Sequence, residues 1–269
     1  MPLSETPKRP EHRASPQEAG GVKGVTSADT TSDARGSSAE LRPPGFARQV
    51  WLIFAKDLRL EWRSREIVYT MALFSALLVI IFSFAFADRA RPFPGAAGGL
   101  LWIAITFAGT LGIGRFFERE REGETIRALL LSPSSPAALY TAKLLAMVVF
   151  MVSTAAVVLP MLVLFFRLEV AAPGIFAALL ISGILGFASI GTLFAAGLMR
   201  ARSRDVMLGI LTYPIALPVI IAGAKGTAAL TAAQPDIATA LIWLKLVTGF
   251  DVVFVVLSLW VFGPLIRGE

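Results

Sequence analysis

The fold of this chain is decided by a charged stretch that lies between two long apolar runs. The stretch extends from Arg115 to Lys143 and reads RFFEREREGETIRALLLSPSSPAALYTAK. Each neighbouring apolar run has about twenty residues, which is the length that an α-helix needs to cross a bilayer. A segment with so many charges cannot lie in hydrocarbon, so we expect a loop outside the membrane that joins two spans.

The same stretch carries the pattern of a short amphipathic helix. The glutamates Glu118, Glu120, Glu122 and Glu124 precede the apolar residues 129–131. This spacing predicts a helix with one apolar side. A following Ser-Pro pair ends it, because the residue before a proline disfavours the helical conformation. We interpret the stretch as a docking surface for a soluble partner.

The composition is that of an integral membrane protein. Of the 269 residues, 55% are hydrophobic and 16% are charged, whereas about a quarter of the residues of a soluble domain are charged. The net charge is +6, but the basic residues fall at the ends of apolar runs, which argues against nucleic acid binding. The chain has no cysteine, and its one histidine, His12, lies in a polar region. Disulfides and thiolate chemistry are therefore excluded.

Two regions precede the apolar spans. Residues 1–46 are rich in Pro, Ser, Gly, Glu and Arg and contain no apolar run, so we expect a disordered polar tail. Residues 47–66 place Trp51, Leu58 and Trp62 at helical spacing, with basic residues on other faces. This pattern predicts an amphipathic helix in the membrane interface, with its tryptophans at headgroup level and its cations toward anionic lipid. The alternative is that this region only begins the first span.

Residues 67–269 contain six apolar segments that are long enough to cross a membrane. We predict them at 68–87, 96–116, 144–166, 175–199, 206–224 and 237–262. With a cytoplasmic amino terminus, most of the lysines and arginines outside the spans fall on the inner side. Basic residues are preferentially retained in the cytoplasm. The sequence therefore predicts an all-α polytopic membrane protein whose two termini and charged loop are cytoplasmic.

Three features inside the spans are candidates for function. Small residues four apart in segment 175–199 favour close packing of helices within the chain, with a subunit interface as the alternative. Pro214 and Pro218 each remove a backbone donor, so the fifth span must bend or break; a hinge, a re-entrant element and a static kink all fit. Asp251 falls near the middle of the sixth span, where an ionisable group is costly and is by default a functional candidate.

Several kinds of catalytic chemistry are missing from the sequence. No Gly-x-x-x-x-Gly-Lys-Ser/Thr loop occurs, so the chain lacks the phosphate-binding loop needed for ATP hydrolysis. The spans contain neither histidine nor cysteine, which are the usual ligands of haem and transition metals. No Ser-His-Asp set and no paired carboxylates are apparent. We therefore expect a non-catalytic membrane protein that works with other chains.

The chain resembles a known family in its motifs. The charged loop, the run GLLW at 99–102 and the run LTYPIALPVI at 211–220 are similar to the B subunit of the cytochrome c maturation system, also called haem exporter protein B. The similarity covers Val50 to Phe262. Six spans with a charged cytoplasmic loop after the second also resemble the membrane subunit of an ABC transporter. The polar tail and the carboxyl-terminal end 262–267 depart from the family pattern.

The resemblance implies a permease-like subunit of the bacterial inner membrane that is paired with a separate ABC ATPase subunit. Other implied partners are a haem-handling membrane protein, a periplasmic haem chaperone, a small accessory membrane peptide and membrane lipids. ATP hydrolysis by the partner would drive haem export or release of the haem-loaded chaperone, with haem as a handled ligand. The residues implied for coupling to the ATPase are Phe117, Glu118, Glu120, Glu122, Gly123, Glu124, Leu129, Leu130 and Pro133. The intramembrane candidates are Asp251, Pro214, Pro218 and Trp102.

Two other functions remain open at this point. The chain could be an ABC-2-type permease that exports a lipid, a polysaccharide or a drug, since such permeases share this architecture. It could also be a membrane scaffold that binds a partner through the loop without coupled motion.

Overall fold

The computed structural model describes residues 45–86, 96–122, 135–199 and 204–267, all of which belong to the unit Pro43–Glu269. This part of the chain is helical. Its helices are α1 (Phe46–Ser64), α2 (Glu66–Phe86), α3 (Ala96–Glu122), α5 (Pro136–Phe166), α6 (Pro173–Gly197), α7 (Arg204–Leu230) and α8 (Ile237–Arg267). The predicted disordered tail lies outside the described residues except for its last two, and Phe46 already opens α1.

Six helices, α2, α3 and α5 to α8, are long and apolar enough to cross a membrane, which confirms the six predicted spans. Several helices exceed the predicted bounds, and two of them do so on either side of the charged stretch. Helix α3 runs to Glu122 and α5 begins at Pro136, so both extend into the charged stretch. The start of α5 is well defined because Ser135 caps it: its side chain accepts a hydrogen bond of 3.1 Å from the backbone N–H of Ala138, and Pro136 follows at the first helical position.

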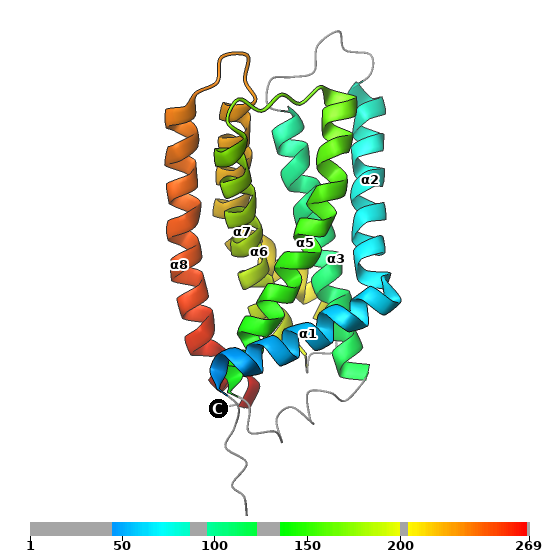
Figure 1. Cartoon of the computed structure of the whole chain (residues 1–269), viewed down its shortest axis with the longest axis vertical. Helices are drawn as coiled ribbons and strands as arrows, with labels where there is room; N and C mark the ends of the chain where they lie inside the picture. The colour runs from blue at the N-terminus through cyan, green and yellow to red at the C-terminus, as the bar shows by residue number, and fades with distance from the viewer. Residues whose placement is uncertain (1–44, 87–95, 123–134, 200–203, 268–269) are drawn as a thin grey trace, which may run out of the picture. The chain divides into compact units, whose positions relative to one another are not determined.

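Helix α1 is a separate element and does not begin the first span. Its last residue is followed by Arg65, which has a φ of 55° in the left-handed region, and α2 starts at the next residue. A left-handed residue at this position ends one helix and redirects the chain. In Figure 1, α1 runs obliquely across the front of α5 while the six spans stand roughly parallel to one another. We call the end of the bundle that carries α1 the charged end.

Small residues let the spans pack closely within this one chain. A Cβ added to Gly109 of α3 would overlap Met151 of α5, and one added to Gly112 would overlap Met71 of α2. Small residues allow helices to approach where no hydrophobic effect drives them together. Gly109 and Gly112 of α3 therefore serve packing within the chain.

At the opposite end of the bundle the helices finish at similar levels. The rings of Phe86 and Phe166, which end α2 and α5, lie 6.4 Å apart. Near this end Asp236 caps α8 by accepting a 2.9 Å hydrogen bond from the backbone N–H of Thr239. The Thr239 hydroxyl also donates to this carboxylate, and these bonds hold the pKa of Asp236 below its usual value.

Because α5 is ten residues longer than α2, it extends beyond α2 at the charged end.

Candidate functional site

The last turns of α3 form a charged extension on a firmly packed base. Phe116 and Phe117 are buried, with 5% and 2% of their surface exposed. The ring of Phe116 meets that of Phe150 on α5 at 5.7 Å in an edge-on arrangement. Glu118, one residue further along, is exposed. The helix thus passes from the core of the bundle to its surface within one turn.

The structure describes only part of the predicted docking surface. Phe117, Glu118, Glu120 and Glu122 belong to α3, so this part of the charged stretch continues the second span and is not a separate short helix. Phe117 lies in the core and is therefore an anchor of this end of α3. Outside the described residues lie Gly123, Glu124, Leu129, Leu130 and Pro133.

A buried ion pair joins α1 to α5 beside the end of α3. Lys143 Nζ lies 2.6 Å from Asp57 Oδ2, and the two side chains are 1% and 3% exposed. Lys56 Nζ binds the other carboxylate oxygen at 3.0 Å, and Lys143 Nζ lies 4.6 Å from the centre of the Phe116 ring. The sequence placed Lys143 in an exposed loop. It lies instead within α5, where its charge is buried because Asp57 compensates it.

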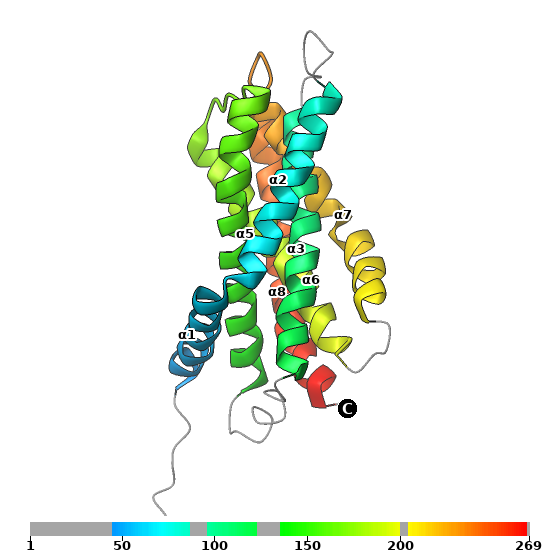
Figure 2. The ribbon, with the colours of Figure 1, turned by 90° about the vertical axis from the view of Figure 1, so that its right-hand side faces the viewer.

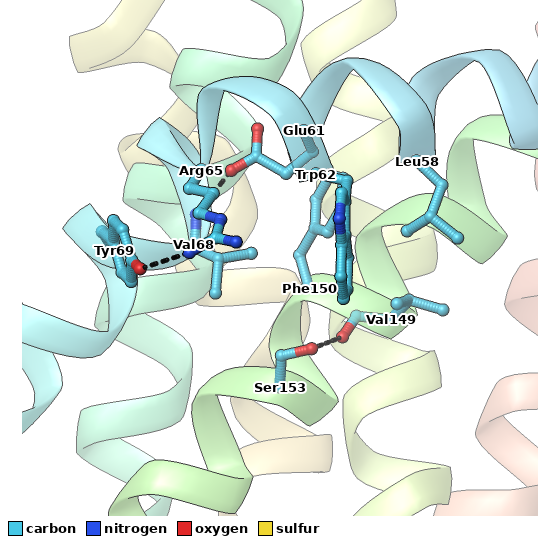
Figure 3. A pocket seen from close by; sticks show the side chains of 9 residues that line it. All are labelled: Leu58, Glu61, Trp62, Arg65, Val68, Tyr69, Val149, Phe150 and Ser153. Carbon is cyan, nitrogen blue, oxygen red and sulfur yellow. Dashed lines mark hydrogen bonds between the residues drawn. The ribbon is translucent and has the colours of Figure 1, made fainter.

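A second set of charges joins α3 to the junction of α1 and α2. Arg119 donates to Glu61 at 3.2 Å and to Ser64 at 2.9 Å, and it also pairs with Glu66 at 3.4 Å. Glu61 is 4% exposed, and its other oxygen accepts the backbone N–H of Val68 at 3.0 Å, a bond drawn in Figure 3. A carboxylate that accepts several such bonds is well compensated even when it is buried. The end of α3 is thereby bonded to both α1 and α2.

Sequence reasoning missed the two buried carboxylates of α1. It assigned the tryptophans of this helix to the membrane and its cations to the lipid surface, and it gave no role to Asp57 and Glu61. These two acids are four residues apart, so they lie on one face of the helix, and that face packs against the bundle. The sequence did carry a signal for this buried face, namely two acids four residues apart in a helix whose other charged residues are basic. Trp51 and Trp62, in contrast, are 64% and 76% exposed, as expected of interfacial residues.

Asp251 is buried between α8 and α6. It is 4% exposed, and Ser182 Oγ donates to its Oδ2 at 2.5 Å. A Cβ added to Gly186 would overlap its Oδ1, and no partner for that oxygen is present among the described residues. Asp251 faces protein, and its bonded partner across the helices is the hydroxyl of Ser182. Lys245 of the same helix is exposed and points elsewhere.

Helix α7 continues through both prolines. Pro214 and Pro218 lie inside the single helix Arg204–Leu230, so the span is not broken and a re-entrant element is excluded. Both prolines are exposed on its outer side, and in Figure 2 the first half of α7 lies at the right-hand edge of the bundle. Tyr213 is bonded to α3, because Thr110 Oγ1 donates to its hydroxyl at 3.1 Å.

Trp102 fills the space where α3, α6 and α7 meet. It is 1% exposed, and its ring N–H donates to Thr227 Oγ1 at 3.0 Å. A Cβ added to Gly183 of α6 or Gly223 of α7 would overlap its ring. Its position makes it a packing residue whose polar nitrogen is satisfied.

The described residues hold no group of three or more His, Cys, Asp or Glu side chains that could bind a metal ion. The methionines that could in principle contact haem include Met147 and Met151, and both are buried in the hydrophobic core. Met151 packs on the surface of α3 at Gly109. These two sulfurs therefore serve packing, as methionine commonly does.

The fold and the site together define a class of protein. It is a polytopic α-helical membrane protein with six apolar spans, a peripheral amphipathic helix, and a charged helical extension after the second span. Comparison with known proteins narrows this class. A family model described as CcmB protein matches residues 48–268, and the chain belongs to this family.

A curated relative agrees with the family assignment. Heme exporter protein B of Pseudomonas aeruginosa is 24% identical over 197 residues, which cover 73% of this chain and 88% of that protein. The family match confirms the resemblance seen in the motifs. It begins after the polar tail and reaches residue 268, so the carboxyl-terminal end, which departs from the expected pattern, also falls within the match.

Proposed function

We propose that this chain is the membrane subunit of an ABC-type transporter that acts in c-type cytochrome biogenesis. A separate ATPase subunit would hydrolyse ATP, and that hydrolysis would drive haem export or release of a haem-loaded periplasmic chaperone. The family match and the name of the Pseudomonas relative, Heme exporter protein B, support haem as the handled ligand. Haem is a substrate in this proposal and not a resident cofactor.

The observation that carries the proposal is the construction of the end of α3. A helix that starts among the spans continues into the charged stretch and exposes Glu118. Its base is fixed by Phe116 against α5 and by Arg119 to Glu61 and Glu66. A push on such an extension moves α3 together with α1 and α2, because the contacts tie them into one unit. This is what coupling to an ATPase requires.

Helix α3 also offers a route from the charged end into the bundle. Its Gly109 and Gly112 pack directly on α5 and α2, and Thr110 is bonded to Tyr213 of α7. Further along, Trp102 is wedged between α6 and α7. In the proposed mechanism, movement of α3 shifts α6 through Trp102 and so alters the surroundings of Asp251, which Ser182 of α6 contacts.

We place the protein in the bacterial inner membrane with both termini and the charged end in the cytoplasm. The excess of basic residues at that end supports this orientation. Its other partners would be a haem-handling membrane protein and a periplasmic haem chaperone. Labelling of single cysteines tests the orientation, since the natural chain has no cysteine. A cysteine at Glu118 that reacts with an impermeant reagent from the periplasm would contradict it.

Charge reversal tests the docking surface. Glu122→Lys together with Glu124→Lys should reduce co-purification of the ATPase, because a carboxylate surface that meets a complementary partner becomes repulsive. Glu169→Lys is the matched control, since Glu169 is exposed in the α5–α6 connection at the opposite end of the bundle. Equal recovery of the ATPase with both variants would remove the support for docking at this end.

The substrate is tested by deletion of the gene. Loss of periplasmic c-type cytochromes, restored by the wild-type chain, is expected from the haem-handling role. Intact cytochromes combined with a defect in the export of a lipid, a polysaccharide or a drug would instead support the ABC-2-type alternative. An ATPase partner without hydrolytic activity separates transport from scaffolding, because a scaffold would still support cytochrome formation.

A further inference from the structure

A groove lies on the outer surface of the bundle where α1 turns into α2. Its volume is about 490 Å³, within the ~300–1,000 Å³ usual for ligand sites. Leu58, Val68, Val149 and Phe150 form its apolar walls, and Trp62 stands over one side. Figure 3 shows these side chains around a common space, with α1 above and α5 below.

The groove lies at the edge of the hydrocarbon layer. The 21 residues of α2 span about 31 Å at 1.5 Å per residue, which matches a hydrocarbon thickness of about 30 Å. The membrane core therefore reaches from Phe86 to the start of α2 beside Arg65. The groove is built around this start, so it opens where acyl chains meet their headgroups.

One cation borders the groove at this depth. Arg65 donates to the hydroxyl of Tyr69 at 3.2 Å, and its guanidinium carbon lies 5.9 Å from the centre of the Trp62 ring. Within the described ranges no carboxylate forms an ion pair with Arg65. The acid in the same wall, Glu61, is already neutralised by Arg119. The rim therefore carries a net positive charge that faces the lipid interface.

The backbone at Arg65 gives this side chain its position. Its φ of 55° is one of two positive values at non-glycine residues in the described part of the chain, the other being Arg167 with 49°. Glycine adopts this conformation at no steric cost, so an arginine here costs stability that glycine would not. From this turn the Arg65 side chain reaches the hydroxyl of Tyr69 and the ring of Trp62.

We propose that this groove is a binding site for one anionic phospholipid of the leaflet at the charged end. One acyl chain lies along Leu58, Val149 and Phe150, and the phosphate accepts hydrogen bonds from Arg65. The ring N–H of the interfacial Trp62 faces the glycerol region. The bound lipid fills the angle between α1 and α2 and so holds α1 against α5. The proposal needs only that the protein lies in a membrane, and it stands or falls separately from haem transport.

Lipid retention by the purified full-length chain tests the site. The protein is incubated with phosphatidylglycerol or phosphatidylcholine of identical acyl chains, and bound lipid is counted by native mass spectrometry. The wild type should retain one phosphatidylglycerol in preference to phosphatidylcholine. Arg65→Gly keeps the backbone conformation and should lower this preference roughly fivefold, as expected for one interfacial cation. Arg65→Lys should retain most of it.

Two matched controls accompany these variants. Arg167→Gly makes the same change at the other left-handed residue, at the opposite end of the bundle, and should leave the preference unchanged. Val149→Phe should fill the groove and reduce retention of the lipid, whereas Val152→Phe places the same ring on an exposed part of α5 and should not. All variants are compared at equal monodispersity and melting temperature.

Three results would overturn the proposal. Equal retention of both lipids by the wild type would exclude an anionic site. If Arg65→Gly and Arg167→Gly have the same effect on the preference for phosphatidylglycerol, Arg65 has no specific role in binding the lipid. If Val149→Phe keeps its lipid but loses a membrane partner on co-purification, the groove holds a protein helix and not a phospholipid.

Discussion

The buried pair of Asp57 and Lys143 makes a sharp prediction about what holds α1 to the bundle. Lys143→Met removes the ammonium group and keeps an unbranched apolar side chain of similar length. The carboxylate of Asp57 then stays at 3% exposure with Lys56 as its remaining ion-pair partner in the described residues. We expect this single change to destabilise the protein strongly, and Asp57→Leu alone to do the same, because each leaves a buried charge that is poorly compensated.

The size of the effect follows from the geometry. Breaking a buried ion pair by removing one partner costs about 3–5 kcal/mol. The lower value, about 3 kcal/mol, applies here, since Lys56 binds the other oxygen at 3.0 Å and is itself 37% exposed. For a chain of this size, 1 kcal/mol shifts the melting temperature by about 2–4 °C. Lys143→Met should therefore melt roughly 6–12 °C below the wild type, and Asp57→Leu, which removes the carboxylate from the buried Lys143, at least as far below.

The double variant Asp57→Leu with Lys143→Met decides between the pair and simple packing. Replacing both charges by apolar side chains of similar volume is commonly neutral or stabilising, so the double variant should melt near the wild type. The assay is loss of the monodisperse peak on size-exclusion chromatography after heating in detergent. Additive losses in the double variant, or single variants that melt within 2 °C of the wild type, would refute the reasoning.

Two further predictions concern the interior of the bundle. Asp251→Asn should leave the melting temperature nearly unchanged, because the amide oxygen still accepts the hydrogen bond from Ser182 and a buried ionisable group is lost. Cytochrome c formation, measured at normal levels of the variant protein, then reports whether ionisation of Asp251 is used. Undiminished formation would remove Asp251 from the mechanism. Gly183→Ala should destabilise the protein by about 1–3 kcal/mol because its Cβ would overlap the ring of Trp102. Gly249→Ala, with nothing within 4 Å of the added Cβ, should be neutral or stabilising, and equal melting temperatures for the two alanine variants would contradict this packing.

Much of the fold could be predicted, because whether a segment can cross a bilayer depends on its own length and hydrophobicity. Apolar runs of the right length define spans wherever they occur, so six spans and the separate helix α1 were expected. The ends of the spans were harder. Polar residues can continue a helix once it leaves the hydrocarbon, and this is how α3 reaches Glu122 and α5 starts at Pro136. Hydropathy marks the edge of the membrane and not the end of the helix.

Single residues of the candidate site could be predicted from the sequence, but the residues that contact them could not. Asp251 could be recognised because a charge in a span stands out against its neighbours, whereas its partner Ser182 could not, since 69 residues separate them in sequence. Lys143 was placed outside the membrane, because a lone lysine is normally solvated. The folded chain places Asp57 of α1 against Lys143, and this ion pair compensates the buried charge of the lysine.

The sequence by itself determined that this chain crosses a membrane six times and presents a charged segment after its second span, because both properties depend on residues that are neighbours in the chain. The tertiary structure decided which charges are buried, which glycines receive Trp102 or a methionine, and how the end of α3 is bonded to α1 and α2. Those outcomes depend on pairs of distant residues, and the free energy of a buried charge is set by the partner that folding brings to it.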